Sequence, residues 1–375
     1  MRKLAFVCLM FVLTGMAAFI HASESGKQQT ATQEEHHGAP HTEHEEEKGF
    51  EAGKFMFDHI ADAYEWHILT FNGKHVSLPL PVILYSKNEG LVTFMSGKLH
   101  HGHSDVQVGN SIFRVAEEGH KYDGKIIEVG PDHEVTKPFD ISITKNIASL
   151  FFSVIIILWI FLSIAKRYRQ NPVAPPRGFQ SLLEPIILFI RDEVAKPSIG
   201  KKYDRFLPFL LTLFFFIWIN NMLGLVPIIP GGANLTGNIS VTLVLALFTF
   251  LVVTFSGNRN YWKHMFNTPG VPLWLKLPIP LMPLIEVFGA FTKPFVLMVR
   301  LFANITAGHI IVLGFLSLIF LFGDKNPAVG FAVAPVTIMF NIFMGLLELL
   351  VAFIQAYVFT FLSALYIGMA VEEHH

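Results

Sequence analysis

The chain has 375 residues and a formal net charge of -1, and 52% of its residues are hydrophobic whereas only 15% are charged. Soluble domains have about 25% charged residues, so this composition indicates a membrane protein. The lack of a basic surplus argues against a nucleic-acid partner. No Gly-x-x-x-x-Gly-Lys-Ser/Thr loop is present, and the single cysteine excludes a disulfide framework or a Cys-based metal site, so we expect no cofactor and no metal.

The first 50 residues are predicted to form a signal peptide and a linker. Residues 1–22 have a charged start, an apolar core and a small residue, Ala22, at a suitable cleavage position. An uncleaved signal anchor is the alternative, and in both cases the following segment is exported. Residues 23–50 are acidic and rich in histidine, which predicts a disordered linker. Its histidines are more typical of a solvated tail than of a metal site, and whether they bind a metal stays open.

Residues 51–140 are predicted to form a small exported domain. The apolar stretches HVSLPLPVILY, LVTFM and KIIEV are separated by Gly, Asn and Asp, which is typical of short strands joined by turns. No catalytic constellation stands out in this segment. We therefore expect it to be dispensable for the chemistry of the membrane part.

Residues 141–375 are predicted to be an all-α polytopic membrane domain. Five apolar blocks predict five crossings, at about 147–164, 206–226, 238–256, 277–322 and 331–371. Lysine and arginine are concentrated in the loops at 165–205 and 257–276, which the positive-inside rule places in the cytoplasm. The N-terminal region is then exported, the C-terminus is cytoplasmic, and the expected location is a bacterial inner membrane.

The last two blocks are too long for simple crossings. A helix of 30 residues already spans about 45 Å, whereas the hydrocarbon core is about 30 Å thick. The connection at 323–330 is short, so the two blocks should form a long, strongly tilted antiparallel hairpin. Pro294 is expected to break the first of them, leaving a short membrane helix at about 281–291.

The hairpin contains several polar side chains within apolar sequence. An ionisable side chain at membrane depth costs about 2.5–3.5 kcal/mol on insertion scales and marks a functional path by default. The group comprises Glu286, Lys293, Arg300, His309 and Glu348, with the uncharged Asn304 and Gln355. Simpler roles exist for three of them: Lys293 can snorkel to an interface, Glu286 can pair with Lys293, and Asn304 can hold helices together. Arg300 has no such simple role, because a guanidinium cannot lose its proton.

Residue spacing predicts which of these side chains meet. Facing residues of an antiparallel hairpin have nearly constant sums of residue numbers, which pairs Arg300 with Gln355 and His309 with Glu348. Arg300 and His309 are nine residues apart and fall on opposite sides of an ideal helix. A His–Glu pair can carry protons near neutral pH, and a fixed cation on another face can favour the ionised form of a partner's carboxylate.

The segments RLFANITAGH at 300–309 and ELLVAFIQAYVFTFLSALYIGMAVEEH at 348–374 resemble subunit a of F-type ATP synthases. The stretches at 143–161, 219–230 and 237–247 fit the same family, so the resemblance covers about 140–375 in order. The exported insert and the His-rich tail depart from the family's usual short amino terminus.

The resemblance implies roles for the hairpin residues. Arg300 matches the arginine that faces the rotating ring of c subunits, and Asn304 and Gln355 match its polar neighbours. His309 stands where many relatives have Glu, and Glu348 where those have His, so the pair is retained with its order reversed. Further candidates for lining the channels are Glu286, Lys293, Asn238 and Thr242.

The resemblance implies a non-catalytic stator subunit of a rotary ATP synthase, with two aqueous half-channels that carry protons to and from c-ring carboxylates. Its expected partners are the c ring, the peripheral-stalk b subunit, membrane lipid and, indirectly, the catalytic head. A self-contained secondary ion transporter is one alternative, but such proteins have internal repeats and no second copy of RLFAN exists. A membrane scaffold for the exported domain is another, but it needs no intramembrane arginine. The choice between proton and sodium stays open.

Overall fold

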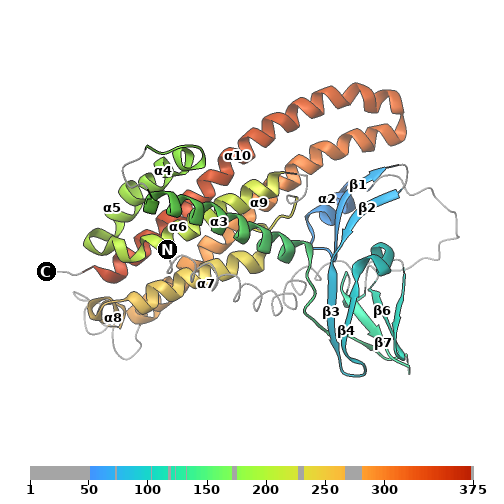
Figure 1. Ribbon diagram of the computed structural model, residues 1–375, viewed down its shortest axis with the longest axis horizontal. Coiled ribbons are helices and arrows are strands. Elements are labelled where there is room, and N and C mark those ends of the chain that lie inside the picture. The colour runs from blue at the N-terminus through green and yellow to red at the C-terminus, as the bar shows by residue number, and fades with distance from the viewer. Residues whose placement is uncertain are drawn as a thin grey trace. The chain divides into compact units, whose positions relative to one another are not determined.

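The structure is a computed structural model, which describes residues 51–71, 74–102, 104–116, 120–122, 124–131, 133–170, 175–226, 232–266 and 281–372. The predicted signal peptide and linker lie outside the described residues. The chain divides into two compact units, a helical unit and a β unit (Figure 1). Helix α3 belongs to both, because its residues up to Phe152 group with the β unit and those from Ser153 with the helical unit.

Helices dominate the chain. They are α2 (Ala52–Ile60), α3 (Lys145–Gln170), α4 (Phe179–Phe189), α5 (Lys196–Ile199), α6 (Tyr203–Leu225), α7 (Ile239–Ser256), α8 (Arg259–Phe266), α9 (Leu281–Lys325) and α10 (Pro327–Val371). Five helical stretches of the described residues are long and apolar enough to cross a membrane, as expected from the five apolar blocks. The α4–α5 segment, with a π-helical turn at Ile190–Ala195, was not predicted, because its apolar runs are short.

Two asparagines fix where membrane helices begin. The Asn238 side-chain oxygen accepts a hydrogen bond from the Ser240 amide at 2.9 Å, and the Asn326 side-chain oxygen accepts one from the Ala328 amide at 3.0 Å. Both residues therefore satisfy amides that lack partners in the first turn of α7 and α10.

Helices α9 and α10 pack along each other as an antiparallel hairpin. At its tip, a Cβ built on Gly330 would lie 2.6 Å from Gly323 Cα, so this turn requires glycine. The predicted break at Pro294 is wrong, and no separate helix exists at 281–291, because α9 is continuous from Leu281 to Lys325. A proline inside a helix removes one backbone hydrogen bond, here the bond to the carbonyl of Ala290, and membrane helices tolerate such an internal proline.

The described residues of the β unit form nine short strands in three antiparallel sheets. They are β1 (Glu65–Phe71), β2 (Lys74–Pro79), β3 (Pro81–Ser86), β4 (Gly90–Met95), β5 (Val106–Val108), β6 (Ser111–Val115), β7 (Ile126–Val129), β8 (Val135–Thr136) and β9 (Phe139–Asp140). Their orders are β1-β2, β4-β3-β9 and β5-β6-β7-β8. The predicted stretch HVSLPLPVILY becomes two strands of different sheets, divided at Leu80 between two prolines.

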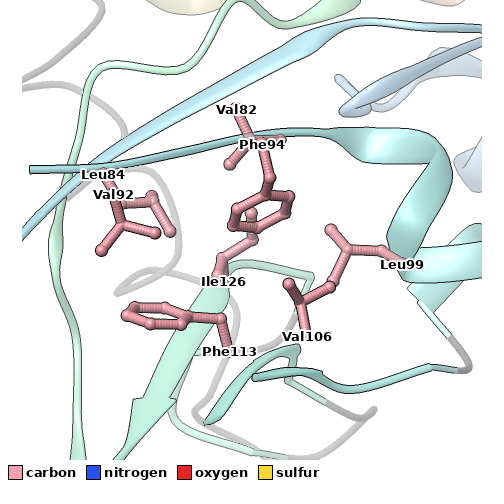
Figure 2. Close-up of a cluster of buried hydrophobic side chains, with 8 residues drawn as sticks. All are labelled: Val82, Leu84, Val92, Phe94, Leu99, Val106, Phe113 and Ile126. Carbon is pink, nitrogen blue, oxygen red and sulfur yellow. The ribbon is translucent and has the colours of Figure 1, made fainter. Parts of the chain in front are cut away.

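The core of the β unit follows from strand alternation. Val82 and Leu84 of β3 point inward with Val92 and Phe94 of β4, while the residues between them are more exposed. Figure 2 shows this cluster, which consists of Val82, Leu84, Val92, Phe94, Leu99, Val106, Phe113 and Ile126. The β unit thus has its own hydrophobic core.

The β unit also holds the start of α3. The Lys145 amide donates to the Ala63 carbonyl at 2.9 Å, and the Asn146 amide donates to Asp62 Oδ1 at 3.1 Å. Burial raises the pKa of the Asp62 carboxyl above its usual value, although the hydrogen bond from Asn146 opposes this. Asp62 therefore acts as a cap for the first membrane helix from a distant position in the sequence.

Candidate functional site in the helical hairpin

The hairpin brings His309 of α9 and Glu348 of α10 together. His309 Nδ1 lies 3.5 Å from Glu348 Oε1, and the two side chains are 17% and 12% exposed. An imidazole and a carboxylate at this distance can exchange a proton with each other and with water. This is the meeting that the residue spacing predicted.

Gly308 makes this approach possible. A Cβ built on Gly308 would lie 2.5 Å from Glu348 Oε1 and 3.0 Å from its Cγ, so the Glu348 side chain rests directly on the backbone of α9. Sequence reasoning missed this role. The available signal was a glycine inside a helix, where it costs about 1 kcal/mol relative to alanine and so needs a packing reason.

Arg300 and Asn304 lie on an exposed face of α9, away from His309. Many large apolar side chains of α9 and α10 are also exposed, among them Phe295, Val299, Ile342, Leu346 and Leu350. Among the described residues Arg300 makes no ion pair. A permanent charge on an apolar membrane surface is costly unless another group balances it.

Gln355 is buried, at 7% exposure, and no hydrogen bond joins it to Arg300 among the described residues. The predicted meeting of these two residues at one level of the hairpin therefore stays a prediction.

A chain of polar contacts connects the neighbours of the His309–Glu348 pair. Asn221 Nδ2 donates to the Ala352 carbonyl at 3.2 Å, and the Thr236 hydroxyl donates to Asn221 Oδ1. The Thr306 hydroxyl donates to the Gly237 carbonyl at 3.3 Å. These contacts tie α6 and the segment before α7 to α9 and α10. These contacts could not be predicted from the sequence, because they join residues from four separate segments.

A second candidate region is a small cavity near the beginning of α9. Its lining comprises Thr249, Phe250, Val253, Tyr261, Ala290, Lys293, Pro294, Tyr366 and Met369. Lys293 Nζ lies 5.4 Å from the centre of the Tyr366 ring, a cation–π distance. Glu286 and Lys293 form no ion pair among the described residues, so the structure does not support the simple pairing considered from sequence.

The two candidates on α7 have structural contacts. Asn238 caps the helix, and Thr242, which is fully buried, donates its hydroxyl to the Ile239 carbonyl at 3.0 Å. Both side chains therefore stabilise the first turns of α7.

Comparison with known proteins assigns the helical part of the chain. The family described as "ATP synthase A chain" matches residues 147–368. The chain belongs to this ATP synthase subunit a family. Members of the family are non-catalytic, proton-translocating membrane subunits of the F-type ATP synthase, so this chain contributes to transport and does not itself catalyse ATP formation.

Relatives of this ATP synthase subunit a come from several bacteria. The chain is 45% identical to ATP synthase subunit a of Chloroherpeton thalassium over 63% of its length and 69% of that protein. It is 41% identical to the protein of the same name from Chlorobium phaeobacteroides, over 73% of this chain and 79% of the relative. The Myxococcus xanthus protein is 45% identical, over 63% and 75%. Residues 55–143 match a different family, "Domain of unknown function (DUF8433)".

Proposed function

We propose that this chain supplies two separate access paths for protons and that Arg300 divides them. A proton enters by one path, binds a carboxylate on a ring of c subunits, travels with the ring and leaves by the other path. The exposed Arg300 in an apolar helix carries the proposal, because a mobile anionic partner would balance its charge and the described residues of this chain provide none.

The His309–Glu348 pair is the proposed end of the exported path. A proton from water binds the pair, and the pair passes a proton to the ring carboxylate and is then protonated again from water. The 3.5 Å separation and low exposure of the two side chains support this relay. Asn304 and Gln355 are proposed to border the ring contact near Arg300.

The cavity beside Lys293 is the proposed second path. It lies near the start of α9, whereas His309 lies nearer the tip of the hairpin, so the two regions are separated along the helix by the level of Arg300. Lys293 and Glu286 are the proposed ionisable groups of this path. Positive-inside asymmetry supports an orientation in which it opens to the cytoplasm of a bacterial cell and the β unit is exported.

The proposed partners follow from the same features. The exposed apolar face around Arg300 fits the outer surface of a c ring. The peripheral-stalk b subunit and the catalytic head are proposed as partners from family membership.

The test is ATP-driven proton pumping by the purified complex in vesicles. Arg300→Ala should abolish pumping while the complex still assembles. Arg300→Lys should also fail, because a desolvated lysine can lose its proton. Lys325→Ala, at the exposed end of the same helix, is the matched control and should pump normally. Normal pumping by Arg300→Lys would contradict the fixed-charge role.

A second measurement separates this proposal from the two alternatives. Proton flux through the purified chain alone, without a ring of small hairpin proteins, would favour a self-contained transporter. Full coupling after Arg300→Ala would favour a scaffold.

A further inference from the structure

The short helix α2 precedes the β unit in sequence but packs against α9 in the helical unit. Ala52, Met56 and Ile60 are spaced four residues apart and are all half-buried, whereas Phe57 is 67% exposed. Residues with this spacing share one face of a helix. Among the described side chains of α2, one face is therefore packed and Phe57 points away from it.

Met56 reaches α9 at Gly314. A Cβ built on Gly314 would lie 3.5 Å from Met56 Sδ, which is ordinary van der Waals contact. The flexible thioether fills the space above a residue without a side chain. A methyl group fits at position 314, but a longer side chain would collide with Met56.

This contact lies close to the proposed proton relay. Gly314 follows His309 by five residues, which is about 7.5 Å along the helix axis, towards the tip of the hairpin. Five residues also turn the helix by about 140°, so Gly314 and His309 face different directions. Met56 is therefore placed to set the position of α9 as a whole, and with it the distance from His309 to Glu348.

The chain beyond α2 is fixed as well. Two residues after Ile60, Asp62 and then Ala63 accept hydrogen bonds from the first turn of α3. Most of α2 lies inside the match to the domain of unknown function at 55–143 and all of it lies outside the ATP synthase match at 147–368. The domain of unknown function thus begins with a helix that contacts the hairpin.

We propose that α2 is a positioning helix for the exported path: Met56, packed on Gly314, holds α9 so that His309 stays opposite Glu348. The inference rests on the proposed function of that pair. It replaces the expectation that all of residues 51–140 are dispensable for translocation, since α2 falls in that segment.

The first test uses passive proton flux through the complete membrane complex after removal of its catalytic head. Gly314→Leu should reduce the flux several-fold, because the leucine displaces Met56. Gly314→Ala is the matched control and should conduct normally, since a Cβ fits there. Adding Met56→Ala to Gly314→Leu should restore most of the flux. Normal flux in Gly314→Leu, or no recovery in the double variant, would overturn the proposal.

The second test measures the position of residue 309 through its exposure to water. A general loss of stability would not change the exposure of this residue alone. In a Cys8→Ser background, His309→Cys is labelled with a water-soluble maleimide in the assembled complex. Gly314→Leu should alter its labelling rate several-fold and Met56→Ala should reverse the change, whereas a cysteine at Ser256 should label at an unchanged rate. Equal labelling at position 309 with and without Gly314→Leu would refute the positioning role.

Further experiments separate a failure of the α2 proposal from a failure of the proposed His309–Glu348 relay. If Gly314→Leu prevents assembly, Met56→Cys with Gly314→Cys should be joined in the assembled complex by a short bifunctional thiol reagent, and absence of the cross-link counts against the contact. If His309→Ala and Glu348→Ala leave the flux unchanged, the proposed relay itself fails. If those two changes stop the flux but the Met56 and Gly314 variants do not, only the role of α2 fails.

Discussion

In the β unit large apolar side chains are inside, as in Val82 at 1% and Phe113 at 0% exposure, whereas in the helical unit many are outside, as in Phe331 at 81% and Met339 at 66%. The helical unit buries large apolar side chains as well, such as Leu210 and Phe214, together with small polar residues such as Thr242 and Ser363, all at 0%. Water surrounds a soluble domain and lipid surrounds a membrane domain, so the two outer surfaces have opposite preferences.

The buried polar groups of the two units also have different partners. In the β unit, Glu128 accepts hydrogen bonds from side chains of distant segments, including Ser86 at 2.8 Å and Ser111 at 2.9 Å. In the helical unit, Thr249 and Ser363 donate to carbonyls of their own helices at 3.2 and 2.8 Å. The same two hydroxyls also lie 3.3 Å from each other, which joins α7 to α10. His309 and Glu348 differ because each faces an ionisable group of another helix, which is why we propose them as the proton relay.

The largest effect in this comparison is expected from Gly308→Ala. The new Cβ would occupy the space of Glu348 Oε1 and force the Glu348 side chain away from His309. Misplacement of reacting groups by about 1 Å can cost 100-fold in rate, so we expect at least a roughly tenfold loss of proton flux. The measurement is passive proton flux through the assembled membrane complex.

Gly345→Ala is the matched control for this change. Gly345 lies on α10 three residues before Glu348, and no atom of another residue lies within 4 Å of a Cβ built on it. Its flux should be normal. If both glycine variants conduct alike, the contact between Glu348 and the α9 backbone is irrelevant to transport.

A smaller effect is expected from exchanging the pair. His309→Ala or Glu348→Ala leaves one polar group poorly compensated at membrane depth and should slow proton entry. The double exchange, His309→Glu with Glu348→His, keeps an acid and an imidazole in contact and should recover much of the flux. Proton flux of the double exchange no higher than that of the worse single variant would show that the residues do not act as a pair.

The sequence predicted those features of this site that follow a regular spacing along the chain, and it did not predict those that depend on how closely two helices pack. The apolar blocks located all five candidate spans, and hairpin spacing paired His309 with Glu348, because both are regular along the chain. The role of Gly308 and the contact of Met56 with Gly314 depend on how closely two helices approach, which periodicity does not encode. The predicted helix break at Pro294 was wrong for a related reason, because the surroundings of α9 decide whether the helix can continue through a proline.

The next largest effect is expected in the β unit, and it concerns the stability of the fold and not proton transport. Glu128→Leu removes the acceptor shared by Ser86, Asn88 and Ser111, and each orphaned buried donor costs about 1–3 kcal/mol. Amides of β3 and β7 should therefore lose protection against hydrogen exchange, while passive proton flux stays normal. Glu134→Leu, at an exposed position, is the control.

Unchanged protection after Glu128→Leu would mean that the three donors find other partners. A loss of flux together with the loss of protection would show that the two units are coupled more closely than their separate cores indicate. Glu128 could not be recognised from sequence, since a glutamate in a short strand is usually exposed.

The smallest expected effect is a pH dependence at Asp62. Burial raises the pKa of Asp62 in the folded chain above the value near 3.8 expected in the unfolded chain. The folded state then binds more protons than the unfolded state above that value, so ionisation of Asp62 lowers stability as pH rises from about 3.8 through the folded-state pKa.

Asp62→Asn keeps an oxygen that can accept from the Asn146 amide but removes the charge. The variant should therefore be relatively more stable at neutral pH than at pH 4, about where Asp62 begins to ionise when unfolded. The measurement is the hydrogen-exchange rate of the Leu84 amide in the variant divided by its rate in the parent protein at the same pH. This ratio cancels the intrinsic pH dependence of exchange. It should fall from pH 4 to neutral pH. A ratio that rises instead would mean that the ionised carboxylate stabilises this junction, and the hydrogen bond to α3 would then outweigh the cost of burial.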